Sequence, residues 1–295
     1  PSLPLMKLNN LWLLTIFSVS ILIGIVFSST AKNSDSSTKL VADFQAQQEI
    51  RIGGHSSTYP AIKILADAYA AQEKSVQISF VLANKSKTAI AAVLDGRLDI
   101  GSINEPFKPE ENDGSLDYRE VAKDALLVGT HPSVNSISNL TTQNLKAIYG
   151  GSMRNWKEIG GPNAEIAVLD LPEDEPAKGL LRKYYLGKDL KNPPTAIILK
   201  EEEDLMAALQ NVIYSIGTFS SAYAKSNQLP VNRLSLNGMN ATPKNVDSGR
   251  YPMVRPIGLI WKKNSSKAVQ AFLDFATSDK GASALRKSDF VLSPR

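Results

Sequence analysis

Apolar residues along the chain alternate between short β-rich runs and helical stripes. In the region 50–71 a short strand with Ile50 and Ile52 leads into two glycines and then a helix. Apolar side chains of this helix recur at i, i+3 and i+4 steps, at Tyr59, Ile62, Leu65, Ala66 and Tyr69. Further β-rich runs lie at 76–82, 98–101, 126–129 and 257–262. Alternating strands and helices of these lengths predict an α/β fold with a largely parallel sheet.

The turn between the first strand and helix carries the residues GGHSST, from Gly53 to Thr58. Pro60 suits the first turn of the helix, where its missing N–H costs nothing. A helix start of this kind presents free backbone N–H groups and a partial positive charge, which favours anions. The same residues also fit a capped turn without a ligand. His55 fits a polar loop residue better than a base, since no serine has a His/Asp pair fixed by sequence, and we expect no enzymatic activity and no catalytic residues.

The N-terminal region contains an uncharged apolar run at residues 11–27, from Leu11 to Phe27. Small residues follow up to Ala31, so residues 1–31 are typical of a secretory signal peptide. The run is also long enough for an uncleaved hydrophobic helix that anchors the protein in the membrane. Residues 32–48 are polar and predict a tether. Both alternatives place the folded part outside the cytoplasmic membrane, in a periplasmic or other extracytoplasmic location.

Composition excludes several classes of site. The chain has 295 residues, two histidines, no cysteine and a formal charge of +4. Without cysteine there are no disulfides and no thiolate metal sites, and two histidines argue against a histidine-rich site, so we expect no metal and no cofactor. The basic residues are scattered, which argues against nucleic acid as a partner. The length favours two lobes over a single core.

The middle of the chain carries the most specific pattern. Residues 140–161 read LTTQNLKAIYGGSMRNWKEIGG, a capped helix, a glycine stop, Asn155-Trp156 and a Gly-Gly turn. This pattern is similar to the phosphate-binding subunits of bacterial ABC phosphate importers, which have the type II periplasmic binding-protein fold. Further segments that resemble the family follow in the same order: GGHSST, KSKTAIAAVLDGRLDIGSINEPF, YSIGTFS, the turn at 245–256, the strand at 257–262 and the ending at 278–294. The resemblance extends from Glu49 to the C-terminus.

This resemblance implies two α/β lobes with mixed sheets flanked by helices. Lobe one is expected at 49–128 and 248–295, and lobe two at 129–247. The family ligand is an oxyanion, held in the cleft by hydroxyls, backbone N–H groups, one arginine and one aspartate. The positions that match this ligand set are Ser56, Ser57, Thr58, Ser86 and Asn104.

Several of the matching positions depart from the family pattern. Asn104 replaces the aspartate, and Leu171 stands at the arginine position. Glu175, Pro176 and Ala177 stand where the family has Ser-Gly-Thr. Lys85, Lys87 and Ala89 stand where the family has the glycines of the second loop. A lost charge-assisted contact removes about 1.5–3 kcal/mol. We therefore expect phosphate binding in the family's manner to be weakened.

The new charged residues have two interpretations. In the implied fold, Lys85 and Lys87 on one lobe face Glu173, Asp174 and Glu175 on the other, so ion pairs between them would close the cleft. Alternatively, the acids favour the positive end of the helix that starts near Pro176, and the lysines form a solvated rim.

Two functions follow from the resemblance and its departures. The first is an extracytoplasmic solute-binding protein of the phosphate ABC-importer type, with a small anion as ligand and an importer permease as partner. The second is a non-transport accessory or structural subunit of another membrane complex, built on the same fold with a self-closed cleft. If residues 11–27 are not cleaved, the membrane is also a partner.

Overall fold

The computed structural model describes residues 48–81, 83, 85–111 and 113–293. These residues belong to one compact unit, residues 46–295. The predicted signal peptide or anchor and nearly all of the predicted tether lie outside the described residues. No helix in the described part of the chain is long and apolar enough to cross a membrane.

The secondary structure alternates between strands and helices, as the apolar pattern predicts. The first elements are β1 (Gln48–Gly54), η1 (Ser56–Thr58), α2 (Tyr59–Gln72), β2 (Val76–Phe80), α3 (Ser86–Leu94), β3 (Ile100–Ile103), η2 (Pro109–Glu111) and β4 (Leu116–Thr130). The middle elements are β5 (Asn139–Leu140), α4 (Thr142–Tyr149), η3 (Trp156–Ile159), β6 (Ala167–Asp170), α5 (Pro176–Leu181), η4 (Arg182–Leu186), β7 (Ile197–Ile198), α6 (Glu202–Asn211), β8 (Ser215–Ser220) and α7 (Ser221–Ser226). The last are β9 (Asn232–Arg233), β10 (Ser235–Leu236), α8 (Pro243–Asp247), β11 (Val254–Lys262), α9 (Lys267–Ala276), α10 (Asp279–Arg286) and β12 (Val291–Leu292).

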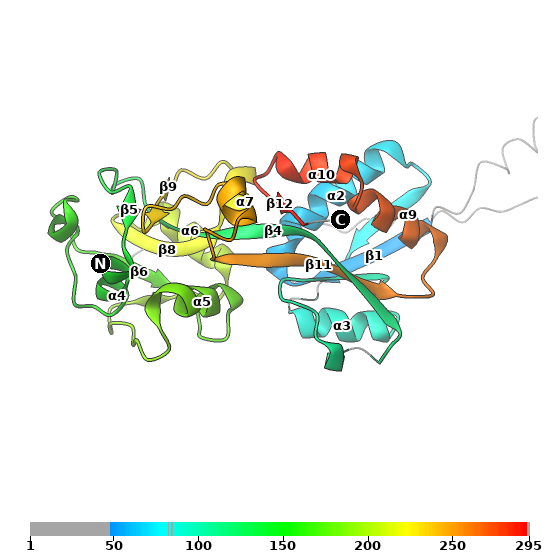
Figure 1. Ribbon diagram of the computed structural model, residues 1–295, viewed down its shortest axis with the longest axis horizontal. Coiled ribbons are helices and arrows are strands. Elements are labelled where there is room, and N and C mark those ends of the chain that lie inside the picture. Colours follow the sequence, from blue (N-terminus) through cyan, green and yellow to red (C-terminus); the bar gives the residue numbers. More distant parts are fainter. Residues whose placement is uncertain (1–47, 82, 84, 112, 294–295) are drawn as a thin grey trace, which may run out of the picture. The chain divides into compact units, whose positions relative to one another are not determined.

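The main sheet has the strand order β2-β1-β3-β11-β4-β8-β6-β7, and β9 and β12 also pair with β4. Strand β1 is parallel to β2 and β3, and β6 is parallel to β7 and β8. The two long strands β4 and β11 are antiparallel to each other and to their other neighbours in the order. The sheet is therefore mixed and flanked by helices, which confirms the α/β class. The expectation of a largely parallel sheet is wrong at β4 and β11, because these strands cross the middle of the sheet in opposite directions (Figure 1).

Helices cover both faces of the sheet around β1 and β11. Helices α2, α9 and α10 lie on one side and α3 on the other (Figure 1). In α2 the predicted stripe is buried at Ile62, Leu65, Ala66 and Tyr69. Tyr59 is 48% exposed and is the member of the predicted stripe that leaves the core. Its ring forms part of the surface beside the first loop.

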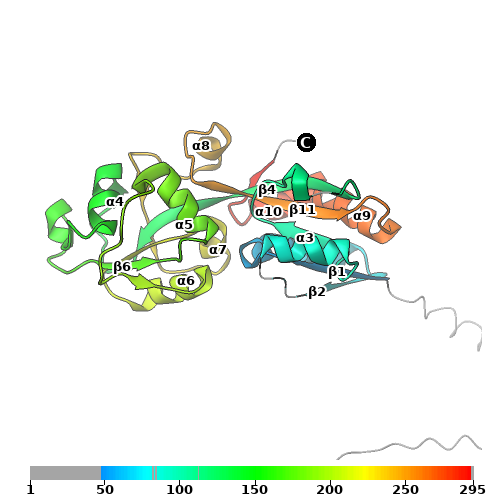
Figure 2. The same ribbon diagram turned by 90° about the horizontal axis from the view of Figure 1, so that it is seen from below.

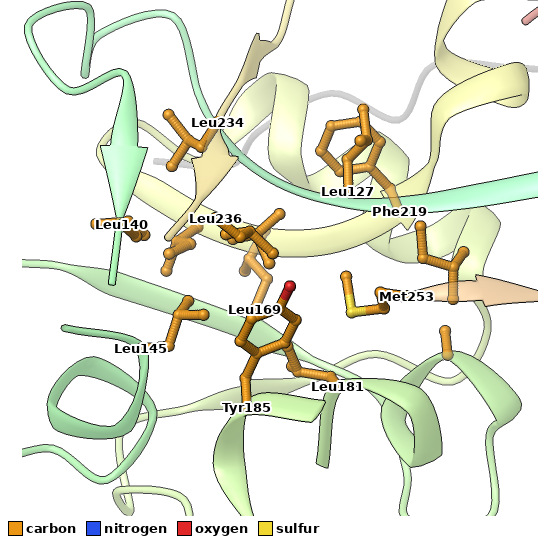
Figure 3. Packing of buried hydrophobic residues seen from close by; sticks show 14 of the residues in the cluster. Leu127, Leu140, Leu145, Leu169, Leu181, Tyr185, Phe219, Leu234, Leu236 and Met253 are labelled. Carbon is orange, nitrogen blue, oxygen red and sulfur yellow. The ribbon is translucent and has the colours of Figure 1, made fainter. Parts of the chain in front are cut away.

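Buried apolar residues form two large cores. We call the cluster drawn from residues 125–253 together with Val291 the central core, and the cluster drawn from 50–122 and 257–290 together with Ala222 the terminal core. In the central core, Leu127 and Phe219 lie on paired strands, and Figure 3 shows them close to Leu169, Leu181 and Met253. Helices α5 and α6 both contact β8 in this core (Figure 2).

The predicted helical hairpin at 140–161 is present in the central core. Thr141 and Asn144 form a reciprocal capping box at the start of α4. Trp156 is fully buried, and its Nε1 donates a 2.8 Å hydrogen bond to the carbonyl of Tyr214. Trp156 therefore fixes this segment both by packing and by one hydrogen bond.

A buried ion triad occupies the boundary between the two cores. Arg255 of β11 lies opposite Asp124 of β4, and its Nη2 donates to Asp124 Oδ2 at 2.9 Å. The Nη1 of Arg255 donates to Glu202 Oε2 at 2.6 Å, from the start of α6. The three side chains are 2%, 1% and 11% exposed. Burial raises the pKa of Asp124, and the positive charge of the Arg255 guanidinium opposes this rise.

We predict that Arg255→Met destabilises the protein by about 3–5 kcal/mol, because it leaves two buried carboxylates without a counter-charge. Urea unfolding at neutral pH measures the change in free energy. Arg51→Met is the matched control, since the Arg51–Asp99 pair of 3.0 Å has side chains 38% and 26% exposed and is worth about 1 kcal/mol or less. Equal losses in the two variants would contradict the assignment of the triad.

Candidate functional site

The first loop is built by β1, η1 and the start of α2. His55 caps η1, and its Nδ1 accepts a hydrogen bond from the backbone N–H of Ser57 at 3.3 Å. Thr58 Oγ1 donates to the carbonyl of His55 at 2.7 Å and lies 2.6 Å from Ser102 Oγ. Gly54 is required here, since a Cβ at this position would lie about 2.0 Å from Ser102 Oγ. The loop is therefore fixed by its own polar side chains.

Three loops bring the predicted ligand residues together. Asn104 follows β3, Ser86 begins α3, and Ser57 lies in the first loop. Asn104 Nδ2 donates to Ser57 Oγ at 3.0 Å, and Ser86 Oγ donates to Asn104 Oδ1 at 3.2 Å. All three residues are buried, whereas Ser56 is half-buried and belongs to a different part of the surface. The resemblance thus selected residues that are in contact, although they come from positions 47 and 18 residues apart.

The hydrogen bonds among these residues have a direction. Asn104 uses its amide N–H toward Ser57 and its carbonyl toward Ser86. Ser57 Oγ, which accepts from Asn104, lies 3.0 Å from His55 Nδ1 and is placed to donate to it. The chain of donors therefore runs from Ser86 through Asn104 and Ser57 to an unprotonated ring nitrogen. The hydroxyl groups of Ser57 and Ser86 therefore both donate to acceptors within the protein.

The environment of His55 favours the neutral ring. The residue is 8% exposed. Burial, followed by the positive charge of Arg255, lowers the pKa of His55 from 6.5 to about 4. A neutral imidazole is the form that accepts at Nδ1, so the electrostatics and the hydrogen-bond geometry agree.

The ion triad lies close to this loop network. A small cavity of about 10 Å³ is lined by Ser57, Pro60, Glu202, Glu203, Met206, Ser220, Tyr223 and Arg255. This volume is about that of one water-sized probe, so it has no room for a polyatomic anion. The carboxylate of Glu202 instead occupies the neighbourhood of the Arg255 guanidinium.

The predicted cleft-closing residues are only partly brought together. Lys85 Nζ lies 3.3 Å from Asp174 Oδ2, with side chains 65% and 71% exposed. Glu173 instead accepts from Arg182 of η4 and lies 4.0 Å from Lys178 Nζ, and the Arg182 hydrogen bond lowers the pKa of Glu173. Among the ion pairs of the described residues, none includes Lys87 or Glu175.

Glu175 has a distinct environment. It is the residue before α5, it is half-buried, and burial together with the charge of Asp174 raises its pKa. The helix begins at Pro176, as expected for acids placed at a positive helix end. The acidic loop therefore combines one exposed pair with Lys85, one acid paired with Arg182 of η4, and Glu175, whose side chain makes no capping hydrogen bond to α5.

Several charged residues of the site were not selected from the sequence. Leu171, at the family's arginine position, is buried in the central core, and the adjacent Asp170 forms a buried ion pair with Lys178. Glu202 and Arg255 were missed as well. The run of acids at 201–204 was a usable signal for Glu202, but no sequence pattern pairs it with an arginine 53 residues later. Within the described residues, no group of three or more His, Cys, Asp or Glu is arranged to hold a metal ion.

We predict that His55 makes the protein less stable in mild acid. Because its folded pKa of about 4 lies below the unfolded value of 6.5, the unfolded chain binds more protons between these values, so stability falls as pH falls through this window. Between about pH 7.5 and pH 5 the loss from this group is about 2 kcal/mol. Acids with raised pKa values act in the opposite direction but are common to all variants.

The measurement compares urea unfolding of the wild type and His55→Gln at the two pH values. The variant should lose about 2 kcal/mol less than the wild type on acidification. His131→Gln is the matched control for loss of an imidazole. A His131→Gln protein that removes the difference as fully as His55→Gln would refute the assignment to His55.

Comparison with known proteins gives the same fold and family. The profile of the PBP superfamily domain matches residues 30–280. The phosphate-binding protein PstS of Bacillus subtilis is 26% identical over 281 residues, which cover 93% of this chain and 90% of that protein. PstS of Borreliella burgdorferi is 25% identical over 250 residues, with coverage of 82% and 89%.

Among solved structures, a putative phosphate ABC transporter substrate-binding protein with bound phosphate from Clostridium perfringens superposes with a TM-score of 0.72. It is 24% identical, and the match covers 84% of this chain and all of that one. This structural similarity shows a shared fold. Together with the profile match over most of the sequence, it means that the chain belongs to the PBP superfamily of periplasmic binding proteins.

Proposed function

We propose that the protein is an extracytoplasmic solute-binding protein of the phosphate ABC-importer type whose oxyanion binding is weakened. The single observation that carries the proposal is the contact between Ser57, Ser86 and Asn104, which brings together polar side chains from η1, the start of α3 and the end of β3. The relatives named phosphate-binding protein PstS support the same class of ligand and an importer permease as partner.

The division into two lobes is part of this proposal. We assign 49–128 and 248–295 to lobe one and 129–247 to lobe two. The terminal and central cores support this division, since they exchange between Ala122 and Ala125 on β4 and between Val254 and Ile257 on β11. The contacts of α9 with β1 and of α10 with α2 support the return of the C-terminal segment to lobe one.

Three features support weakened binding of phosphate. The hydroxyl protons of Ser57 and Ser86 are directed to protein acceptors. No positive side chain stands at position 171, which is an apolar core residue. Asp174 and Glu175 place negative charge on the loop that would face the anion, and unlike an arginine they repel it.

A second function, a non-transport accessory or structural subunit of a membrane complex, is favoured by the contacts that join the proposed lobes. The exposed Lys85–Asp174 pair contributes about 1 kcal/mol at most. The link from Glu202 to Arg255 is the stronger constraint, because its side chains are 11% and 2% exposed and solvent screens it less. An accessory subunit that does not take part in transport can function with a cleft closed in this way.

We predict that inorganic phosphate binds with a dissociation constant weaker than about 10 µM at neutral pH. Two or three lost charge-assisted contacts each reduce affinity by about tenfold per 1.4 kcal/mol. Isothermal titration calorimetry of the purified protein measures the constant. Binding at low micromolar concentration or tighter would refute the proposed weakening.

The same titration separates the two functions. In Asp174→Asn/Glu175→Gln, two repelling charges are removed, so a protein that retains an anion site should bind phosphate several-fold more tightly. Asp67→Asn/Glu73→Gln removes the same charge from the first helix and its end and is the matched control. Tighter binding confined to the first variant supports the solute-binding function. Absence of binding in all three proteins supports the accessory function.

The proposed location is extracytoplasmic, with residues 1–31 as a signal peptide or an anchor. We predict cleavage after Ala31, because small residues follow the apolar run at the spacing that signal peptidases require. N-terminal sequencing of the protein recovered from its native membrane fraction decides this point. A mature start at Lys32 excludes the anchor, and an intact apolar run excludes cleavage.

A further inference from the structure

A second cavity lies beside the first loop. Its volume is about 260 Å³. Its lining residues are Ile52, Gly53, Gly54, His55, Ser56, Thr58, Tyr59, Pro60, Ile62, Phe80, Val81, Ala83, Ser102, Glu203 and Tyr223. Ser57, Ser86 and Asn104 are not among them. The cavity therefore shares Ser56 and Thr58 with the positions matched to the oxyanion but does not include the Ser57–Asn104–Ser86 contact.

Exposed apolar side chains gather at this cavity. Tyr59, Phe80 and Val81 are 48%, 37% and 42% exposed, although all three are large hydrophobic residues. The rings of Tyr59 and Phe80 pack edge to face, with centroids 5.1 Å apart, and thereby form a preformed aromatic wall. Exposed apolar side chains that line a common hollow are a mark of a binding surface, in contrast to single scattered ones.

The polar groups of the cavity have one sign of charge. Glu203 is the carboxylate among the described lining residues, and its Oε2 is buried without a hydrogen-bond partner in the described part of the chain. Burial and the charges of Glu202 and Glu201 raise the pKa of Glu203. The other titratable groups on the wall are Tyr59, Tyr223 and His55, and His55 is neutral at pH 7. Arg255 does not line the cavity and is already paired with Asp124 and Glu202.

The size of the cavity limits the ligand. A cavity of about 150 Å³ is sufficient to hold benzene, and drug-sized ligands occupy about 300–1,000 Å³. A volume of about 260 Å³ therefore suits a single ring or a short branched chain with one substituent. An ammonium group on that substituent would give Glu203 Oε2 a hydrogen-bond donor, while the aromatic wall contacts the apolar body.

We propose that this cavity binds a small organic amine, with its apolar body against Tyr59 and Phe80 and its ammonium group at Glu203. The inference does not depend on the proposed oxyanion function, since Glu203, Tyr59 and Phe80, which carry it, are not among the positions matched to the oxyanion. A phosphate titration and an amine titration can thus fail separately.

The test uses benzylamine as the probe and benzyl alcohol as its uncharged counterpart of equal size. Both are titrated at neutral pH against the protein comprising residues 32–295, and binding is followed by the chemical shifts of amides in the first loop and β2. We expect benzylamine to bind about five- to tenfold more tightly than benzyl alcohol. Shift changes should centre on Gly53, Tyr59 and Phe80.

Two variants identify the carboxylate. Glu203→Gln keeps the shape of the cavity and should abolish the preference for the amine, leaving benzyl alcohol affinity within about twofold. Glu201→Gln removes an equal charge two residues away and is the matched control, which should retain most of the preference. Phe80→Ala should weaken both probes.

The outcomes separate the proposal from a general attraction of the acidic helix start for cations. Equal binding of the two probes, absence of binding at millimolar concentration, or shift changes remote from the first loop would overturn the proposal. An equal loss in Glu201→Gln and Glu203→Gln would also overturn it, since this would show a diffuse electrostatic effect without a site.

Discussion

The arrangement of this protein depends on the pairing of β4 with β11. Each of these strands contributes residues to both the terminal and the central core, so the two cores cannot separate without bending or breaking this pair. At the exchange point the apolar sequence is interrupted by Asp124 on one strand and Arg255 on the other. Burial makes their ion pair obligatory, and Glu202 extends it to α6. The charge between the cores is therefore a point of attachment between elements that would otherwise share few apolar contacts.

The loop network next to this attachment shows how a polar site can be satisfied without a ligand. Asn104 is neutral and has a donor and an acceptor on one side chain, so it can link two serines at once. A carboxylate at the same position would accept from both. The exchange of one oxygen for an amide nitrogen thus changes the direction of every hydrogen bond that follows in the chain, and the neutral His55 terminates it.

The sequence predicted local features well where one short segment determines them. The stripe of α2 from Ile62 to Tyr69, the capped helix before Trp156 and the start of α5 at Pro176 each follow from spacing and capping within a few residues. The mixed pairing of β4 and β11 was not predictable from alternation alone, because strand direction depends on partners 130 residues apart in sequence, as between Asp124 and Arg255.

Some residues of the candidate site could likewise be predicted from the sequence, and others could not. Ser57, Ser86 and Asn104 were found through their positions in a family pattern, and their contacts agree with that choice. Glu173 was assigned by proximity in sequence to Asp174 and Glu175, yet it pairs with Arg182, since neighbouring side chains in a turn point in different directions. Arg255 has no local signature, because it is a single polar residue in an apolar strand.

The donor direction of the Ser86–Asn104–Ser57–His55 hydrogen-bond chain also links two positions of the sequence. The donor direction of such a chain is kept only if the residue at one end donates and the residue at the other end accepts. Aspartate at position 104 would accept from Ser57 Oγ, so His55 Nδ1 would lose the hydroxyl donor and keep only the backbone N–H of Ser57. Substitutions at positions 55 and 104 are therefore coupled.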